Sequence, residues 1–472
     1  MRRAAQKNVS ICRVIIGVLG LLLYYRADAN VCQDPPSQFK AERCGYTWGN
    51  LFRVETLIKR RFLFAAIFAL LTCTLRAGYA SPKPRPVMDP NFYAYDARAH
   101  FEVKVVPYAR LGAIAVSQVT FPSPVITPYP VNNTVTGFLF LPSTPGPYPV
   151  MLVEHEWLPV TLENESRMCR RIAEGGMAAF LIVQPYSYNR RPMPRIPDVE
   201  LLSADVPQMV GAVRQAVLDA RRTFDWLSAR PDIDPQRMGV AGISLGGIFA
   251  PLIAGVDHRA KVLVTIVGGV DVSDIVFDSP ITYGIQPGFR YHGVTYDSLK
   301  RDMAPIEPAN WLQGFDPHNA LLFNGRYDVF ISPKQAHHLS EALGGAPIVW
   351  TNTGHYGSVF AEKEIEGTGI KFLRSRFGLD PAPFIPPSTL PAPTIKIGLL
   401  AGGHEGASPA IAYQIINFDK TAHFSLDGQL TLHGFAVAPS VSLDESNSLG
   451  FEFPILHGKS HPKLFYFFHF TL

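Results

Sequence analysis

The middle of the chain alternates between short, fully apolar runs and longer stretches in which apolar residues recur every three or four positions. Fully apolar runs are typical of strands buried on both faces, whereas the longer spacing is typical of helices with one buried side. The predicted strands lie at 134–142, 148–153, 177–183, 238–241, 261–267, 320–328 (with the loop that ends it) and 347–350. The predicted helices lie at 162–174, 201–227, 247–254, 333–343 and 362–377. This alternation predicts an α/β fold: an open, mostly parallel central sheet with right-handed crossovers and helices on both faces.

Changes in composition divide the chain into five regions: a leader (1–80), an N-terminal linker (81–109), a main domain (110–378), a Pro-rich linker (379–394) and a C-terminal extension (395–472). Inside the main domain, about 271–317 lacks a simple period and is rich in aromatic residues, which predicts an inserted lid. The C-terminal extension shows some alternation, as at 421–433. It is therefore expected to be either a small β-rich module or a poorly ordered tail, and its role stays open.

The leader contains two apolar runs. Residues 59–80 combine three basic residues, a 12-residue apolar run and small residues at Gly78 and Ala80, which predicts a secretory signal cleaved after Ala80. A second run lies upstream, within 11–25, so that either residues 1–53 are an over-extended reading frame or 11–25 is a membrane anchor. The protein is expected to be exported, to the periplasm or beyond, and to contact a membrane only through these N-terminal segments if they are retained.

Charge and cysteine content narrow the function classes. The net charge is +4, but residues 1–80 hold 12 Lys/Arg and 4 Asp/Glu, which leaves 31 and 35 in the rest. The body is therefore mildly acidic, and nucleic-acid binding is not expected. Only Cys169 lies outside the leader, and no Cys/His spacing indicates a zinc site. We expect no metal and no cofactor.

A G-x-S-x-G pattern at 242–246 joins the predicted strand at 238–241 to a helix. At such a strand–turn–helix junction the serine is held in a strained conformation, and the two glycines let strand and helix cross closely. The hydroxyl of Ser244 is then exposed beside a helix N-terminus, whose free N–H groups can receive a developing negative charge. Ser244 is the candidate nucleophile.

Three more polar positions follow predicted strands: His155, Asp328 and His355. In open parallel sheets the active site forms at the carboxyl ends of the strands, so these side chains should meet Ser244 at one edge. A serine hydroxyl is a weak nucleophile and needs a base such as His355, which Asp328 would orient. Other candidates exist; they are the acids Asp271 and Asp274 and the mid-helix histidines His337 and His338.

These motifs, in the order Ser…Asp…His, resemble those of the α/β-hydrolase superfamily over about 110–378. The sequence His155-Glu156-Trp157 at a strand end is similar to the dienelactone hydrolase branch, except that this chain has a serine where that branch has a cysteine. The resemblance implies an oxyanion hole made by the backbone N–H groups of Leu245 and Trp157. It also implies that His155 shapes this loop, while Glu156 either contacts Ser244 or a substrate hydroxyl, or faces solvent.

The function expected from these residues is an exported serine hydrolase that cleaves small carboxylic esters through an acyl-enzyme. The serine favours a general carboxylesterase over true dienelactone specificity. One alternative is a serine peptidase or acylaminoacyl-peptidase of the same fold. The other is a non-catalytic binding protein on the same scaffold, since a fold alone does not establish function.

Overall fold

A computed structural model describes most of the chain after the leader. The described residues are 89–159, 161–194, 198–402, 406–417, 424–432, 434–443, 446–454 and 463–472. The predictions made for the leader, including 11–25 and 59–80, fall outside them. Within this described part, no helix is both long and apolar enough to cross a membrane.

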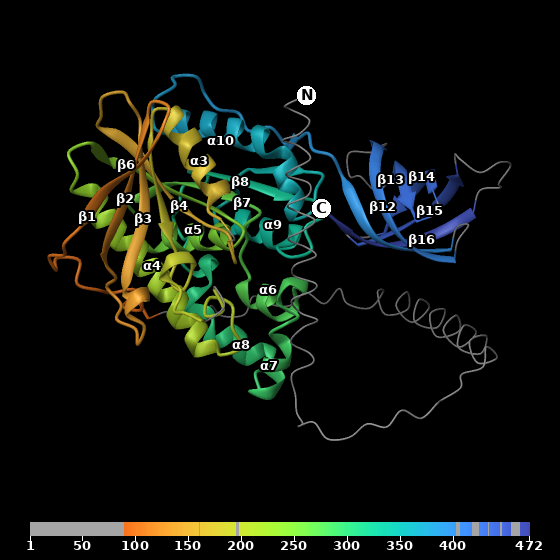
Figure 1. The fold of residues 1–472 in the computed structure, drawn as a ribbon, viewed down its shortest axis with the longest axis horizontal. Helices are drawn as coiled ribbons and strands as arrows, with labels where there is room; N and C mark the ends of the chain where they lie inside the picture. The colour runs from red at the N-terminus through yellow and green to blue at the C-terminus, as the bar shows by residue number, and fades with distance from the viewer. Residues whose placement is uncertain are drawn as a thin grey trace, which may run out of the picture. The chain divides into compact units, whose positions relative to one another are not determined.

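A ten-stranded sheet forms the centre of the main domain (Figure 1). Its order is β1 (Lys104–Leu111), β2 (Ile114–Pro122), β3 (Thr134–Leu141), β5 (Ala178–Val183), β4 (Tyr148–Glu154), β6 (Ile233–Ile243), β7 (Ala260–Ile266), β8 (Ala320–Gly325), β9 (Ile348–Thr351) and β10 (Thr389–Leu390). The pairs from β5 to β10 are parallel, whereas β1, β2, β3 and β5 pair antiparallel. The predicted α/β class with a mostly parallel sheet is confirmed.

Helices cover both faces of this sheet because its inner strands are apolar on both sides. Strand β4 is buried throughout. Its residues alternate between two cores: Val150 and Leu152 face one, Met151 and Val153 the other. The first core is closed by α4 (Val206–Ser228), α5 (Leu245–Val256) and α9 (Pro333–Ala342), and the second by α3 (Glu163–Glu174) and α10 (Glu362–Arg376).

Helix α4 begins five residues after the start that the apolar spacing predicted. The carboxylate of Asp205 accepts the N–H of Gln208 (3.1 Å), which caps the helix there, and Pro207 fits the first turn. Leu201 and Leu202 are buried as expected, but they lie in the loop that leads to this cap. Apolar spacing alone therefore overestimated the length of the helix.

The predicted inserted segment is present as a series of short helices. They are α6 (Val272–Asp278), η5 (Pro280–Thr282), α7 (Gln286–Tyr291), α8 (Tyr296–Asp302), η6 (Ala304–Ile306), η7 (Pro308–Asn310) and η8 (Pro317–Asn319). The carboxylate of Glu307 accepts the N–H groups of Asp271 (3.1 Å) and Val272 (2.7 Å), which ties the far end of the segment to its start. Phe289, Leu299 and Met303 are buried against the first core.

Both predicted linkers contain ordered structure. In the 81–109 range, β1 begins at Lys104 and Tyr93 is buried, with its ring 5.2 Å from that of Trp311. In the 379–394 range, β10 pairs in parallel with β9. The view of 81–109 as a plain linker was wrong, because its aromatic residues complete the core of the main domain.

The C-terminal extension is a closed six-stranded antiparallel barrel, so the β-rich alternative is confirmed. Its strands are β11 (Ile395–Gly402), β12 (Gly406–Asn417), β13 (Phe424–Thr431), β14 (Gly434–Ser442), β15 (Asn447–Pro454) and β16 (Lys463–Thr471). Neighbours in sequence pair with one another, and β16 closes the ring against β11.

Candidate active site

Ser244 lies at the sharp turn between β6 and α5. Its backbone is at φ 56° and ψ −113°, a conformation that costs a non-glycine residue on the order of 1–3 kcal/mol. A Cβ atom at Gly242 would lie 2.0 Å from the Gly246 carbonyl oxygen, and one at Gly246 would lie 2.3 Å from the Glu154 carbonyl oxygen. Both glycines are therefore required where the backbone segments cross closely, and this tight turn makes the side chain of Ser244 project outward.

A chain of two hydrogen bonds connects Ser244, His355 and Asp328. The Ser244 Oγ lies 2.8 Å from His355 Nε2, and His355 Nδ1 lies 2.7 Å from Asp328 Oδ2. The other Asp328 oxygen accepts the N–H groups of Phe330 (2.9 Å) and Ile331 (3.0 Å). Because Asp328 only accepts, the imidazole proton lies on Nδ1, and Nε2 is free to accept the proton of the serine hydroxyl.

The other candidate acids and histidines have different partners. The carboxylate of Asp271 contacts His338 Nδ1 (2.5 Å). Asp274 accepts a hydrogen bond from the Tyr296 hydroxyl and lies 3.3 Å from the Lys334 ammonium. The ring of His337 lies 5.2 Å from that of Trp350. The arrangement thus brings Asp328 and His355 to Ser244 and keeps these four side chains in contacts of their own.

The loop after β4 packs directly on the serine turn, because the Glu154 and His155 carbonyl oxygens are the atoms that a Cβ at Gly246 would meet. Trp157 and Leu245 both line the pocket into which Ser244 points. The Trp157 indole donates to the Asp198 carbonyl (3.3 Å), and the Asp198 carboxylate accepts the Leu158 N–H (2.6 Å). These bonds fix the loop so that the backbone near Trp157 is preorganised.

His155 is fully buried and both of its ring nitrogens are used. Nε2 accepts the Gln184 N–H (3.1 Å), and Nδ1 lies 2.6 Å from the Glu156 carbonyl oxygen. Burial lowers its pKa to about 4, so the ring stays neutral near pH 7. This environment fits a residue that shapes the loop and does not titrate.

Glu156 is half-buried, and its carboxylate lies 3.4 Å from the Asn164 amide. Burial raises its pKa, while attraction to His355 lowers it. Its own N–H donates to Glu165 (3.1 Å), a buried acid whose pKa burial raises to about 7. Glu156 therefore lies close enough to His355 for their charges to interact.

Sequence reasoning missed several residues that support the site. Glu154, at the end of β4, is buried, and its carboxylate accepts the Gln184 amide (3.2 Å); burial raises its pKa to about 8. Gly354 donates its N–H to the Leu472 carbonyl (2.8 Å), so the residue that follows β16 supports the loop that carries His355. The strand-end position of Glu154 was readable in the sequence, but the contact with Leu472 joins residues far apart and left no local signal.

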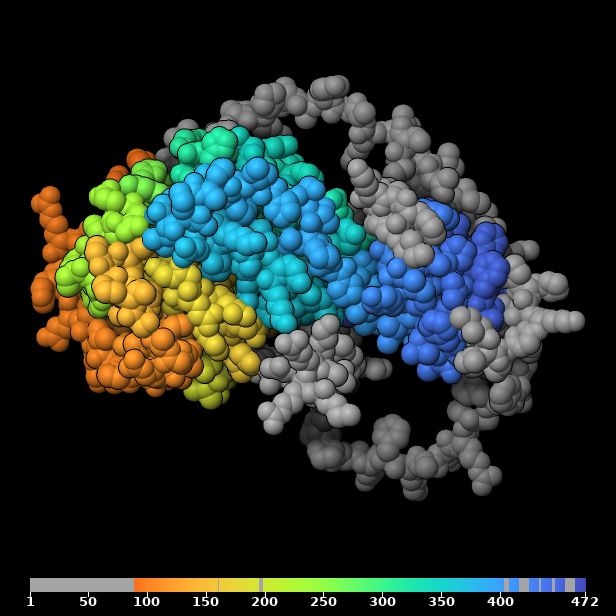
Figure 2. Space-filling view, turned by 90° about the horizontal axis from the view of Figure 1, so that it is seen from above, coloured from red at the N-terminus to blue at the C-terminus, as the bar shows by residue number. Residues whose placement is uncertain are grey.

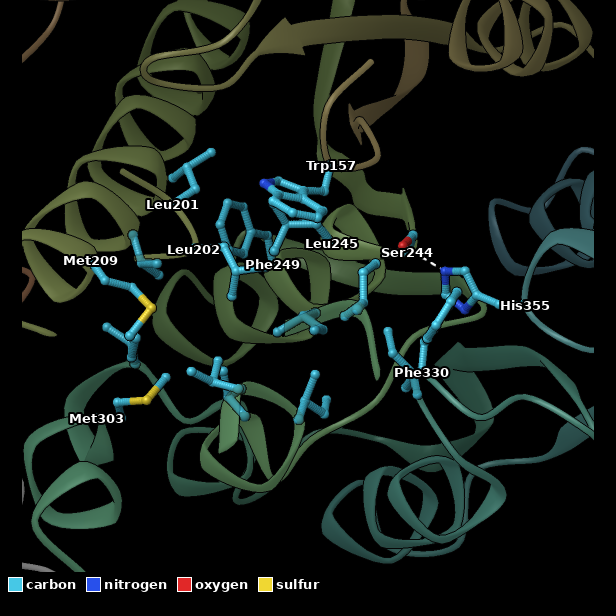
Figure 3. Close-up of a pocket in the computed structure, with 18 residues that line it drawn as sticks. Trp157, Leu201, Leu202, Met209, Ser244, Leu245, Phe249, Met303, Phe330 and His355 are labelled. Atoms are coloured by element: carbon cyan, nitrogen blue, oxygen red, sulfur yellow. Dashed lines mark hydrogen bonds between the residues drawn. The ribbon is translucent and has the colours of Figure 1, made fainter. Parts of the chain in front are cut away.

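The pocket beside Ser244 is apolar. Besides Ser244 and His355, its lining is made of aliphatic side chains, two methionines and the aromatic rings of Trp157, Phe249 and Phe330. Figure 3 shows Ser244 and His355 at one end and Met209 and Met303 at the other. The cavity volume of about 50 Å³ is small. Among the described residues, no group of three or more His, Cys, Asp and Glu side chains is placed to hold a metal ion.

Two protein-family models match parts of the main domain. The dienelactone hydrolase family matches residues 135–279, and the prolyl oligopeptidase family matches residues 214–355. Neither match reaches half of the chain. Together with the sheet order, they show an α/β-hydrolase that is similar to dienelactone hydrolases and is a hydrolase of the esterase or peptidase type.

Individual relatives are distant. An uncharacterized Bacillus subtilis protein, YdjC, is 28% identical over 92 residues, which are 20% of this chain and 79% of that protein. An acetyl xylan esterase from Paenibacillus sp. R4 is 20% identical, with a TM-score of 0.47, over 62% of this chain and 96% of that one. Acetyl xylan esterase 1 from a Thermoanaerobacterium species is 14% identical, with a TM-score of 0.44, over 57% of this chain and 89% of that one.

Proposed function

We propose that this α/β-hydrolase is a serine esterase that cleaves carboxylic esters through an acyl-enzyme. The observation that carries the proposal is the unbroken chain of hydrogen bonds from Ser244 through His355 to Asp328, with the serine on a strained turn. Strain is kept at a position when function requires it, and a serine needed only for packing would have no use for this geometry.

In the proposed reaction, the Ser244 oxygen attacks the ester carbonyl carbon and His355 Nε2 takes the hydroxyl proton. The carbonyl oxygen gains negative charge, which the backbone N–H groups of Leu245 and Trp157 stabilise; each such donor contributes about 3–4 kcal/mol. The intermediate collapses, and His355 gives its proton to the departing alcohol. Water then attacks the acyl-enzyme by the same route in reverse and releases the acid. Asp328 orients the imidazole and stabilises its charged form throughout.

The pocket lining supports esters with an apolar acyl or alcohol group. Apart from the reacting Ser244 and His355, the lining side chains are aliphatic, methionine or aromatic, and the indole N–H of Trp157 is already bonded to the Asp198 carbonyl (3.3 Å). A sugar hydroxyl placed there would therefore lose its hydrogen bonds to water. Tyr186 and Tyr188 are not among the residues that line this pocket. We therefore infer a preference for short to medium alkyl esters over sugar esters.

The test is hydrolysis of p-nitrophenyl acetate, butyrate and octanoate by the full chain and by Ser244→Ala, with a fluorophosphonate label as a second readout. We expect the substitution to lower kcat by about 10⁴–10⁶-fold and to abolish labelling. Ser228→Ala is the matched control, because Ser228 on α4 contacts the Phe224 carbonyl (2.7 Å) and the Met238 sulfur (3.6 Å) and does not line the pocket. Equal turnover by wild type and Ser244→Ala would refute the proposal.

A second candidate is a serine peptidase, which the match to the prolyl oligopeptidase family over 214–355 favours. The same catalytic residues would then cleave amides. Peptidyl p-nitroanilides, assayed beside the esters, separate the two: kcat/KM higher for the anilides would establish the peptidase. If the folded wild type neither turned over nor labelled, the binding-protein alternative would replace both.

Export is proposed from the leader alone, where a basic segment, a 12-residue apolar run and small residues precede Ser81. N-terminal sequencing of the natural product tests it. A mature N-terminus at Ser81 is the expected result, and any recovered peptide from residues 1–53 would contradict the idea that this stretch is an over-extended reading frame.

A further inference from the structure

The C-terminal barrel exposes apolar side chains on all six of its strands. Sixteen of the 27 large apolar side chains that the described residues expose belong to 395–472. They include Leu399 on β11, Ile411 and Tyr413 on β12, Leu430 on β13, Phe435 on β14, Phe451 and Phe453 on β15, and Phe468 on β16. Their exposed fractions run from 38% for Phe435 to 59% for Leu399. The barrel is the dark blue part of the surface in Figure 2.

The inside of the same barrel is largely polar. The Lys396 ammonium lies 3.0 Å from the Asp427 carboxylate, and both side chains are almost fully buried. The hydroxyls of Ser425 and Ser440 each donate to Asp427 (2.8 Å). Beside a small apolar cluster, the interior thus holds an ion pair whose acceptors are satisfied within the barrel. Burying such an ion pair costs desolvation free energy, so the pair does not stabilise the barrel in the way that an apolar core would.

Charge follows the same inside-out distribution. The six strands contain four charged residues: Lys396, Asp427 and Glu452 are buried, and only Lys463, at the start of β16, is exposed. His469 also points inward, where its Nε2 lies 2.8 Å from the Ser448 hydroxyl. A barrel in water normally has the opposite pattern, with apolar side chains inside and charged ones outside. Strands that alternate apolar-out and polar-in are characteristic of barrels whose outer surface contacts lipid.

We propose that the outer surface of β11–β16 is a lipid-binding surface, which enters the hydrocarbon layer of a phospholipid membrane. A protein partner docked on a barrel covers one side of it, whereas here the exposed apolar residues lie on every strand around the ring. Lipid hydrocarbon chains can cover the whole outer surface of a barrel, and they form no hydrogen bonds or ion pairs with it. This matches the outward faces of the six strands, which bear a single charged side chain. This proposal is independent of the chemistry at Ser244.

The experiment places an environment-sensitive nitrobenzoxadiazole label on the barrel of the full chain. The four leader cysteines are replaced by serine, and Cys169 is buried and does not react. Single cysteines are then introduced as Ile411→Cys and Phe451→Cys, two outward positions on different strands. The matched control is Tyr108→Cys on β1, whose side chain is 64% exposed. Each labelled protein is mixed with vesicles of phosphatidylcholine and phosphatidylglycerol, and circular dichroism with thermal unfolding confirms that it is folded.

We expect the emission at positions 411 and 451 to rise several-fold and shift to the blue with vesicles, and to be quenched by doxyl-labelled lipid, while position 108 stays unchanged. Protein that floats with vesicles while both barrel labels stay unchanged would overturn the proposal, because other segments would then hold the protein on the lipid. A shift that needs no vesicles and grows with protein concentration would also overturn it, in favour of a second copy as the partner.

Discussion

Replacing Asp328 by asparagine should nearly abolish turnover while leaving the fold intact. The reason lies in how the two carboxylate oxygens are used. Oδ1 accepts two backbone N–H groups, from Phe330 and Ile331, so the single oxygen of an asparagine must take that side. Its NH₂ group is then directed at His355 Nδ1, where Oδ2 now lies at 2.7 Å.

A donor at that position favours the wrong form of His355. With an NH₂ facing Nδ1, this nitrogen becomes the acceptor and the proton moves to Nε2, which then points a hydrogen at Ser244. The base can no longer accept the serine proton. In a comparable serine hydrolase geometry the same substitution lowers kcat by about 10⁴-fold, which equals about 5 kcal/mol of transition-state stabilisation.

The assay is kcat for p-nitrophenyl butyrate near pH 7, with circular dichroism and thermal unfolding to verify the fold. KM should change little, because Asp328 does not line the pocket. The control is Asp271→Asn, whose carboxylate contacts His338 instead, and its kcat should stay within a few-fold of wild type. A loss below 10-fold in Asp328→Asn would refute the reasoning. The double variant with Glu156→Gln would then ask whether the neighbouring glutamate supports His355.

Three further predictions concern the His355 loop, a buried acid and the far end of the pocket. In Gly354→Ala a Cβ would lie 1.7 Å from the Thr471 carbonyl oxygen, so the loop that carries His355 must move. We expect kcat to fall about 10²-fold with KM little changed, and an unaltered kcat would contradict this. Burial raises the pKa of Glu154 to about 8, so the folded state keeps a proton that the unfolded state loses near pH 4.5, and stability falls as pH rises between these values. Glu154→Gln should reduce the fall of the urea midpoints between pH 5 and 9, leaving the part that comes from Glu165, and an unchanged slope would count against this. Met303→Trp should fill the far end of the pocket and lower kcat/KM for p-nitrophenyl octanoate about 10–100-fold, with little change for p-nitrophenyl acetate. Equal losses of kcat/KM for both esters would place the acyl chain elsewhere.

The sequence allowed the fold and the meeting of Ser244, Asp328 and His355 to be predicted for one physical reason. Each residue follows an apolar run, apolar runs become parallel strands, and the carboxyl ends of parallel strands share one edge. Local chemistry also marked the turn at Ser244, since a tight crossing of strand and helix requires glycine two residues before and two residues after the serine. The roles given to these residues stay a proposal until they are tested.

Features that depend on distant parts of the chain could not be predicted. Strand β10 is two residues long and exists because β9 offers it an edge. The support of Gly354 by Leu472 joins two regions that no local pattern connects. In the barrel, the alternation was visible at 421–433, but a period of two does not say which set of side chains faces inward. Only the closed ring shows that Asp427 is inside and Leu430 outside.

The strained backbone at Ser244 has a consequence for how this protein can evolve. Glycine at that position would adopt φ 56° without penalty, so selection for stability alone would favour an inactive chain that is harder to unfold. A lineage that lost its substrate would be expected to lose this serine early, before the glycines around it, because Gly242 and Gly246 are needed for the strand and helix to cross at all. Position 244 is thus where a homologue that keeps the activity and one that has lost it would first differ in sequence.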